Sequence, residues 1–302
     1  GCLGLWNDAC EAALKPIIAS LRKHSKAAVA IQLAHAGRKA SSQRPWEGGQ
    51  LIALENGGWQ AEAPSAIAHK DGEAPPRALD QAGLLRVRDA FVAAARRAMR
   101  LGLDAIELHS AHGYLLHQFL SPISNKRTDQ YGGSLENRMR FPLEVFEAIR
   151  AVVPAEKPVG IKVSATDWIG GGWDLAQTIG YAKELKRRGI DWVDCSSGGI
   201  SPHQKIPLGP GYQVPFAAAV KQEANVPTIA VGLITQASQA EEIVASGQAD
   251  MVALARGMLY DPRWGWHAAA ELGGQVAAPP PYWRAPPNTQ KELFGATSFG
   301  VR

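Results

Sequence analysis

The chain has 302 residues, 46% hydrophobic and 20% charged, so it can bury a large core and falls in the size range of one-domain α/β barrels. Its formal net charge of +4, with 32 basic residues scattered among 28 acidic ones, excludes a polycationic tail for nucleic acids. The three cysteines, Cys2, Cys10 and Cys195, form no C-x-x-C pair, and no apolar run approaches the ~20 residues of a membrane span. We therefore expect a cytoplasmic protein without nucleic-acid or membrane partners and without a metal site.

Short apolar runs rich in β-branched residues alternate with longer segments of helical period, which is typical of a parallel sheet covered by helices. The predicted strands are 28–33, 105–109, 159–164, 192–196, 228–231 and 251–255. One predicted helix begins with a capping box formed by Asp174 and Gln177. Another carries an apolar stripe made of Leu84, Val87, Phe91, Ala94 and Ala98. Because a closed barrel of this type has eight strands, the sequence predicts a (β/α)8 TIM barrel of which about six strands are identifiable.

The ends of the chain and one internal segment depart from a regular barrel. The chain begins on a predicted helix, residues 7–22, so we expect a strand, a helix and a second strand to precede Gly1. The single domain 1–302 is then an N-terminally incomplete (β/α) barrel. The segment 38–79 is long for a loop, which predicts a lid-like excursion over the barrel mouth, and the Pro-rich start of 277–302 predicts a C-terminal tail.

Polar side chains cluster where a predicted strand ends, which is where barrels of this kind hold their chemistry. His109, His112 and Tyr114 lie within one such segment. Two imidazoles can bind a carbonyl or nitro oxygen on which negative charge develops, and a phenol can supply a proton. Two other interpretations of the histidines stay open: a metal site, for which no third ligand lies at suitable spacing, and a structural role with hydrogen bonds to neighbouring backbone.

A long segment around these residues is similar to the signature stretch of the Old Yellow Enzyme family. It runs over residues 107–138 and reads ELHSAHGYLLHQFLSPISNKRTDQYGGSLENR. Segments 31–40, 162–167 and 231–234 resemble the same family, in particular its bacterial thermophilic-like or xenobiotic-reductase branch. The resemblance covers residues 1–302. It implies an oxidoreductase that uses FMN and NADPH or NADH, in a ping-pong reaction, to reduce C=C bonds activated by carbonyl or nitro groups, as in enones and maleimides.

The resemblance also implies roles for individual residues. His109 and His112 would bind the electron-withdrawing oxygen of the substrate, hydride would come from flavin N5, and Tyr114 would protonate the α-carbon from the opposite face. Gln32 matches the family residue that binds the flavin pyrimidine, and Lys162 stands where the family usually has Arg. An ammonium lacks the planar bidentate contacts of a guanidinium, so we expect Lys162 to bind flavin less rigidly or to shift its potential. An ordinary structural position stays open for both of these residues.

The FMN phosphate is expected at the loops that follow the last predicted strands, because backbone N–H groups in such loops point toward phosphate oxygens. The candidates are Gly198, Gly199, Gly232, Ala255 and Arg256. The alternative is that these glycines only permit turns.

Near the C-terminus, the resemblance implies that Arg284 reaches the active site of a neighbouring subunit, which requires a homodimer or a homotetramer. The alternative is a surface arginine on a solvated tail.

The sequence departs from the family in one motif, since it lacks the Pro-Met-Cys-x-Tyr type segment of the first strand, and no cysteine here is assigned that role. Three rival functions stay open. One is a related reductase acting on another substrate, such as a dienoyl-CoA. Another is a Schiff-base aldolase that uses Lys162, which leaves the His-x-x-His-x-Tyr run unexplained. The third is a flavin-free chain without activity.

Overall fold

The structure, a computed structural model, describes residues 3–298 and has one parallel sheet of six strands in the order β1-β4-β5-β6-β7-β8. The strands are β1 (Ala30–Leu33), β4 (Ala105–Ser110), β5 (Val159–Ser164), β6 (Trp192–Ser196), β7 (Thr228–Val231) and β8 (Met251–Ala253). All six predicted strands and the α/β class are confirmed, and β5, β6 and β7 have the predicted bounds. Within residues 3–298, β1 and β8 are the two ends of the sheet, and closure by eight strands stays a prediction.

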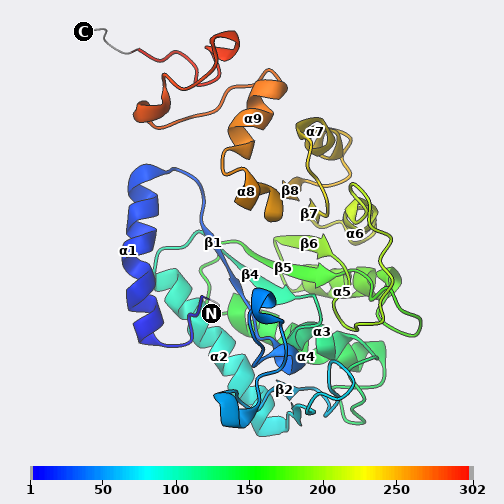
Figure 1. Ribbon diagram of the computed structural model, residues 1–302. Coiled ribbons are helices and arrows are strands. Elements are labelled where there is room, and N and C mark those ends of the chain that lie inside the picture. The colour runs from blue at the N-terminus through cyan, green and yellow to red at the C-terminus, as the bar shows by residue number, and fades with distance from the viewer. Residues whose placement is uncertain (1–2, 299–302) are drawn as a thin grey trace.

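Helices surround the sheet, with α1 beside α2 and the C-terminal segment beyond α9 (Figure 1). They are α1 (Asp8–His24), α2 (Gln81–Arg100), α3 (Leu115–Leu120), α4 (Leu135–Arg150), α5 (Leu175–Arg187), α6 (Val214–Ala224), α7 (Ala237–Ala245), α8 (Arg256–Tyr260) and α9 (Trp264–Glu271). The Asp174 carboxylate caps α5 by accepting the N–H of Gln177, as predicted. The capping box is only half formed, because Oε1 of Gln177 accepts from the Arg138 guanidinium at 2.8 Å instead. None of the helices between residues 3 and 298 is long and apolar enough to cross a membrane.

The two faces of the sheet carry different side chains. Leu108, Ile161 and Val193 are fully buried and belong to the hydrophobic core, and they pair in one row across β4, β5 and β6. One residue further along, Lys162 pairs with Asp194. Because successive side chains of a strand point to opposite faces, the apolar row packs into the core and the polar row lies on the other face. This polar face bears the predicted site residues of the strands.

The excursion of residues 38–79 is fastened to the rest of the chain. It contains the short helical turns Gly37–Lys39, Pro45–Glu47 and Leu54–Asn56 and the parallel pair β2 (Glu62–Ala63) and β3 (Arg77–Ala78). Arg38 is only 5% exposed, and its guanidinium donates to the carbonyls of Ile67 (3.4 Å), Ala68 (3.1 Å) and Ile200 (2.5 Å). One buried side chain therefore ties the excursion to the loop after β6.

The C-terminal segment packs against α9 rather than leaving the protein as a loose tail. The Trp266 ring lies 5.2 Å from the Tyr282 ring and 5.1 Å from the Phe294 ring, as centroid distances. The backbone N–H of Val276 donates to the Leu293 carbonyl at 2.8 Å. Aromatic packing around one tryptophan thus orders the segment that contains the Pro-rich stretch.

Two free cysteines occupy different environments. Cys195 lies in β6 with 0% of its surface exposed, and burial raises the pKa of its thiol. Cys10 lies half-buried in α1. Cys2 lies outside the described residues.

Candidate active site

The three predicted catalytic side chains lie together after β4. The His109 ring centroid is 5.2 Å from that of His112 and 4.9 Å from that of Tyr114, both in edge-on contact. His109 belongs to the strand itself, His112 has a left-handed φ of 56°, and Tyr114 precedes the first residue of α3. Between residues 3 and 298 no group of three or more His, Cys, Asp or Glu side chains is placed to hold a metal ion. The metal interpretation of the histidines therefore gains no support there.

Both imidazoles are neutral at neutral pH. Burial, with a contribution from the charge of Lys162, lowers the pKa of His109 and the pKa of His112 to about 3. The Nδ1 of His109 accepts the N–H of Ala111 at 3.3 Å, so the ring proton of His109 is on Nε2. The Nε2 of His112 lies 2.7 Å from the Oγ of Ser196. His109 can thus offer its Nε2–H to a substrate oxygen, and His112 can offer an N–H from Nδ1 when the Ser196 hydroxyl donates to its Nε2.

Lys39, which the sequence could not place in the site, contacts this cluster from the excursion. Its Nζ donates to the carbonyls of His112 (3.0 Å) and Gly199 (3.3 Å) and lies 5.5 Å from the centre of the Tyr114 ring. Burial lowers the pKa of Lys39, and the neighbouring cations of the excursion add to this effect. The sequence placed Lys39 in a family-like segment, but its contact with the catalytic turn depends on tertiary structure.

The two predicted flavin-binding residues of the strands lie on the polar face of the sheet. The exposed Gln32 donates from Nε2 to Glu107 Oε1 at 2.6 Å, and the Lys162 ammonium pairs with the carboxylate of Asp194. Burial raises the pKa of Asp194 to about 6, against the opposing effect of Lys162. An amide and an ammonium are donors that the pyrimidine oxygens of a flavin accept, so these residues fit an FMN group.

The glycines after β6 are explained by a close approach of two chain segments. Gly199 has φ 95°, and a Cβ there would lie 2.4 Å from the carbonyl carbon of His112. Its N–H donates to the Gln204 side chain at 2.5 Å, and the N–H of Gly198 donates to the Thr166 carbonyl at 2.8 Å. These contacts account for both glycines without a phosphate, and their phosphate role stays a prediction.

The remaining phosphate candidates share one edge of the sheet. Gly232 follows β7 with φ 122°, and Ala255 and Arg256 follow the neighbouring strand β8. Ala255 and Arg256 are exposed. Arg284 is also exposed, and the C-terminal segment that contains it lies beyond α9 and far from α3 (Figure 1). The structure therefore brings the catalytic candidates together but leaves Arg284 apart from them.

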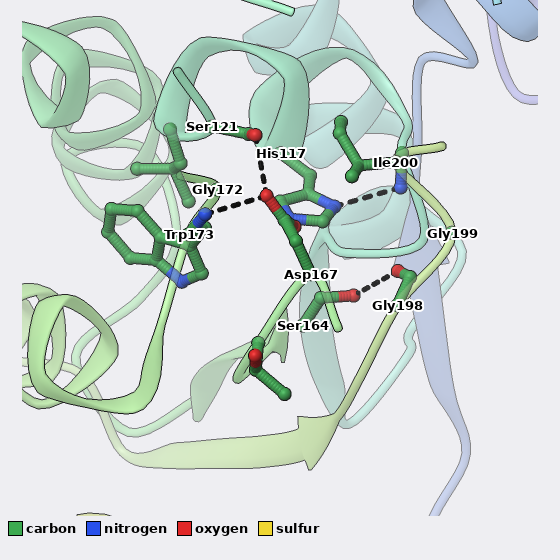
Figure 2. A network of polar contacts seen from close by, with 12 residues as sticks. His117, Ser121, Ser164, Asp167, Gly172, Trp173, Gly198, Gly199 and Ile200 are labelled. Carbon is green, nitrogen blue, oxygen red and sulfur yellow. Dashed lines mark hydrogen bonds and ion pairs between the residues drawn. The ribbon is translucent and has the colours of Figure 1, made fainter. Parts of the chain in front are cut away.

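A buried polar network lies behind the catalytic turn, and the sequence gave no indication of it (Figure 2). The side chains of His117 and Asp167 are both 0% exposed, with Nε2 and Oδ1 2.9 Å apart. The Ser121 hydroxyl and the Trp173 N–H donate to the other Asp167 oxygen at 2.6 and 2.7 Å. Both members of the pair stand in family-like segments of the sequence, but nothing in the sequence alone shows that they meet.

Comparisons with known proteins identify the family of the chain. The model of the NADH:flavin oxidoreductase / NADH oxidase family matches residues 1–274. The NADPH dehydrogenase of Geobacillus thermodenitrificans is 43% identical over 282 residues, which are 93% of this chain and 77% of that relative. The NADPH dehydrogenase of Bacillus subtilis is 40% identical, over 93% of this chain and 78% of that relative.

Solved structures give the same result. A 2-naphthoyl-CoA reductase complex superposes with a TM-score of 0.77 at 27% identity, covering 90% of this chain and 42% of that one. Morphinone reductase superposes with a TM-score of 0.71 at 30% identity, covering 90% of this chain and 72% of that one. The resemblance to the Old Yellow Enzymes and the expected FMN and nicotinamide reductant are thereby confirmed. The chain belongs to the NADH:flavin oxidoreductase / NADH oxidase family and is an NAD(P)H-dependent FMN oxidoreductase.

Proposed function

We propose that this enzyme is an ene-reductase, which reduces C=C bonds activated by a carbonyl or nitro group, as in enones and maleimides. The observation that carries the proposal is the pair of neutral imidazoles, one buried and one half-buried, beside a phenol after β4. Preorganised neutral donors stabilise negative charge that develops on a substrate oxygen, without a cost of reorganisation during the reaction. The name of the similar Geobacillus enzyme, NADPH dehydrogenase, supports NADPH as the reductant.

Each member of the group has a distinct part in this reaction. His109 donates from Nε2, the atom that bears its proton. When the Ser196 hydroxyl donates to Nε2 of His112, the proton of that ring is on Nδ1, which becomes the second donor to the substrate oxygen. Tyr114 supplies the proton to the α-carbon. When bound, FMN would transfer the reducing equivalents of NAD(P)H to the alkene, and Gln32 and Lys162 would hold it.

The proposal extends to the surroundings of the site. The phosphate of FMN would bind at the loops after β6, β7 and β8, where the exposed Arg256 offers a guanidinium that a phosphate can reach. The exposed Arg284 would reach the site of a second copy in a homodimer or homotetramer. The excursion 38–79 would act as a lid. The part around Arg38 would stay in place, because Arg38 is bonded to the Ile200 carbonyl, and the remainder would move. Eight strands would close the barrel.

The test is a visible absorption spectrum of the purified chain before and after addition of FMN, followed by anaerobic NADPH oxidation with 2-cyclohexenone. We expect flavin bands and alkene-dependent oxidation. A chain that binds FMN and oxidises NADPH but leaves the enone unreduced would contradict the proposal.

A double variant tests the histidines. A phenol that binds beside the flavin gives a long-wavelength charge-transfer band. In H109A/H112A we expect FMN binding to persist but this band to disappear. Enone turnover should fall by at least about 100-fold. H24A and H203A, each at an exposed histidine, serve as controls and should change neither enone turnover nor the phenol band. An unchanged band with unchanged turnover would remove both histidines from the mechanism.

A further inference from the structure

The turn that carries His112 has a backbone conformation that side chains disfavour. His112 has φ 56° and Gly113 has φ 71°. A left-handed conformation is unfavourable for a non-glycine residue and persists only where the surroundings determine it. The His112 N–H donates to Ser164 Oγ at 2.8 Å, and its carbonyl accepts from Lys39 Nζ at 3.0 Å. The contacts of this turn therefore decide where the His112 imidazole points.

The next peptide of the turn is held by two side chains of α3. The Gly113 N–H donates to Nδ1 of His117 at 2.9 Å, and the Gly113 carbonyl accepts from Nε2 of Gln118 at 2.6 Å. Because Nδ1 of His117 accepts a hydrogen bond, the proton of this ring is on Nε2. Nε2 is the atom that lies 2.9 Å from Oδ1 of Asp167. His117 thus links the turn after β4 to a carboxylate after β5.

Asp167 is itself fixed in one position (Figure 2). Its Oδ2 accepts from Ser121 Oγ at 2.6 Å and from the Trp173 N–H at 2.7 Å, and its own N–H donates to the Trp173 carbonyl at 2.9 Å. Burial by itself would raise the pKa of Asp167, but His117 and these donors hold the pKa below its usual value. The carboxylate therefore stays charged although it is fully buried, and it orients the ring that faces it.

We propose that Asp167 and His117 are positioning residues for the reaction. Asp167 fixes the orientation and the tautomer of His117, and His117 fixes the Gly113 peptide, which sets the directions of His112 and Tyr114. Neither positioning residue has to touch the substrate. The inference rests on the proposed roles of His112 and Tyr114. It adds that the loop after β5, which contains Asp167, helps to set the geometry of substrate binding.

A measurement on the wild-type protein tests the tautomer. In a ¹⁵N-detected NMR spectrum, with the His117 signals identified by their loss in H117N, we expect a neutral ring protonated on Nε2. A ring protonated on Nδ1, or on both nitrogens, at neutral pH overturns the proposal, because Nδ1 would then be unable to accept from Gly113. This measurement needs no substrate or turnover, so its result is independent of the proposed function.

Two variants separate positioning from simple structural support. The side-chain amide of Asn reaches the place of ring Nδ1, so H117N keeps an acceptor for the Gly113 N–H. The longer side chain of Gln reaches the place of Nε2. H117Q therefore keeps a partner for Asp167 but loses the acceptor for Gly113. We expect H117N to retain phenol affinity and enone kcat within about threefold of wild type, and H117Q to lose about 10- to 100-fold in both. H24N and H24Q, at an exposed histidine, are the matched controls.

Urea unfolding of all variants gives their stabilities, which a merely structural role would change in parallel with activity. Equal effects of H117N and H117Q on kcat and phenol affinity, whether large or small, overturn the proposal. If wild-type protein loaded with FMN shows neither a phenol band nor enone turnover, the proposed function fails, while the tautomer of His117 remains a separate test of the pair.

Discussion

The carboxyl ends of β4, β5 and β6 differ from those of β7 and β8. At the first three, His109, Ser164 and Ser196 are 4%, 1% and 6% exposed and take part in hydrogen bonds with neighbouring segments. After β8, the side chains of α8 are open to solvent, with Leu259 82% and Tyr260 94% exposed. The region proposed to bind the substrate is thus preorganised by the chain's own contacts, whereas the region proposed to bind the phosphate is exposed.

The difference indicates which part of the site has a fixed geometry and which part can adapt to a ligand. Buried polar groups are costly unless they are fully satisfied, and a satisfied network holds one geometry. An exposed loop has no such constraint and is free to adapt to a ligand. Substitutions in the buried region should therefore change stability and ligand binding together, and substitutions in the exposed region should change stability little.

The largest effect is expected at Arg38. In R38A three backbone carbonyls lose a buried charged donor, so the free energy of unfolding should fall by on the order of 4 kcal/mol. Urea unfolding measures this loss, and limited proteolysis should cut the excursion faster. In R44A, where the arginine is 56% exposed, the change should stay below about 0.5 kcal/mol. A loss below about 1 kcal/mol in R38A would show that the excursion is not fastened at this point.

The next effect concerns the close approach at Gly199. Both G199A and G247A place a side chain at positive φ, 95° and 77°, but only Gly199 lies against other backbone, that of His112. We expect G247A to destabilise the protein by about 1 kcal/mol and G199A by about 3 kcal/mol, since overpacking adds to the conformational cost. Thermal or urea unfolding compares the two. Equal losses would mean that the loop after β6 yields to the added methyl group.

Near neutral pH a smaller effect is expected from the two histidines, and it grows as the pH falls. The unfolded chain protonates both imidazoles near pH 6.5, whereas the folded protein holds the pKa of His109 and of His112 at about 3. The unfolded state then binds more protons between these values, so this stability is fully present above about pH 6.5 and is lost as the pH falls toward 3. Each histidine contributes a slope approaching about 1.4 kcal/mol per pH unit. H109Q/H112Q should flatten the slope of unfolding free energy between pH 4 and 6, and an unchanged slope would contradict burial of neutral rings.

The smallest effect is expected on α8. Because Leu259 is 82% exposed, L259S should change the free energy of unfolding by less than about 0.5 kcal/mol. L185S, at a fully buried leucine of α5, is the matched substitution and should cost several kcal/mol, about 3 or more. A loss above about 1 kcal/mol in L259S would show that α8 is covered in solution.

Local sequence patterns predicted the strands and the segment that carries the three catalytic candidates. The six strands followed from β-branched apolar runs, and Asp174 marked the start of α5 through its cap. The cluster of His109, His112 and Tyr114 was predictable because all three side chains fall in one short segment after a strand.

Contacts between distant segments were beyond such patterns. Asp167 reaches His117 only because β4 and β5 are neighbours and their carboxyl ends meet. Gly199 had to be a glycine because the loop after β6 approaches the backbone of His112, a reason that spacing along the chain does not reveal. The packing of the C-terminal segment against Trp266 was likewise beyond local patterns, because its aromatic partners Tyr282 and Phe294 lie far along the chain.

The buried thiol of Cys195 can report how often the folded sheet opens. Its thiol sits in β6, a strand with neighbours on both sides, with no exposed surface and a raised pKa. A thiol reagent can modify it only when the sheet separates, so the rate of modification counts global opening events rather than local fluctuation. Cys10, half-buried in α1, reacts from the folded state. The modification rate of Cys195, a residue outside the catalytic cluster, therefore measures how long the sheet stays closed.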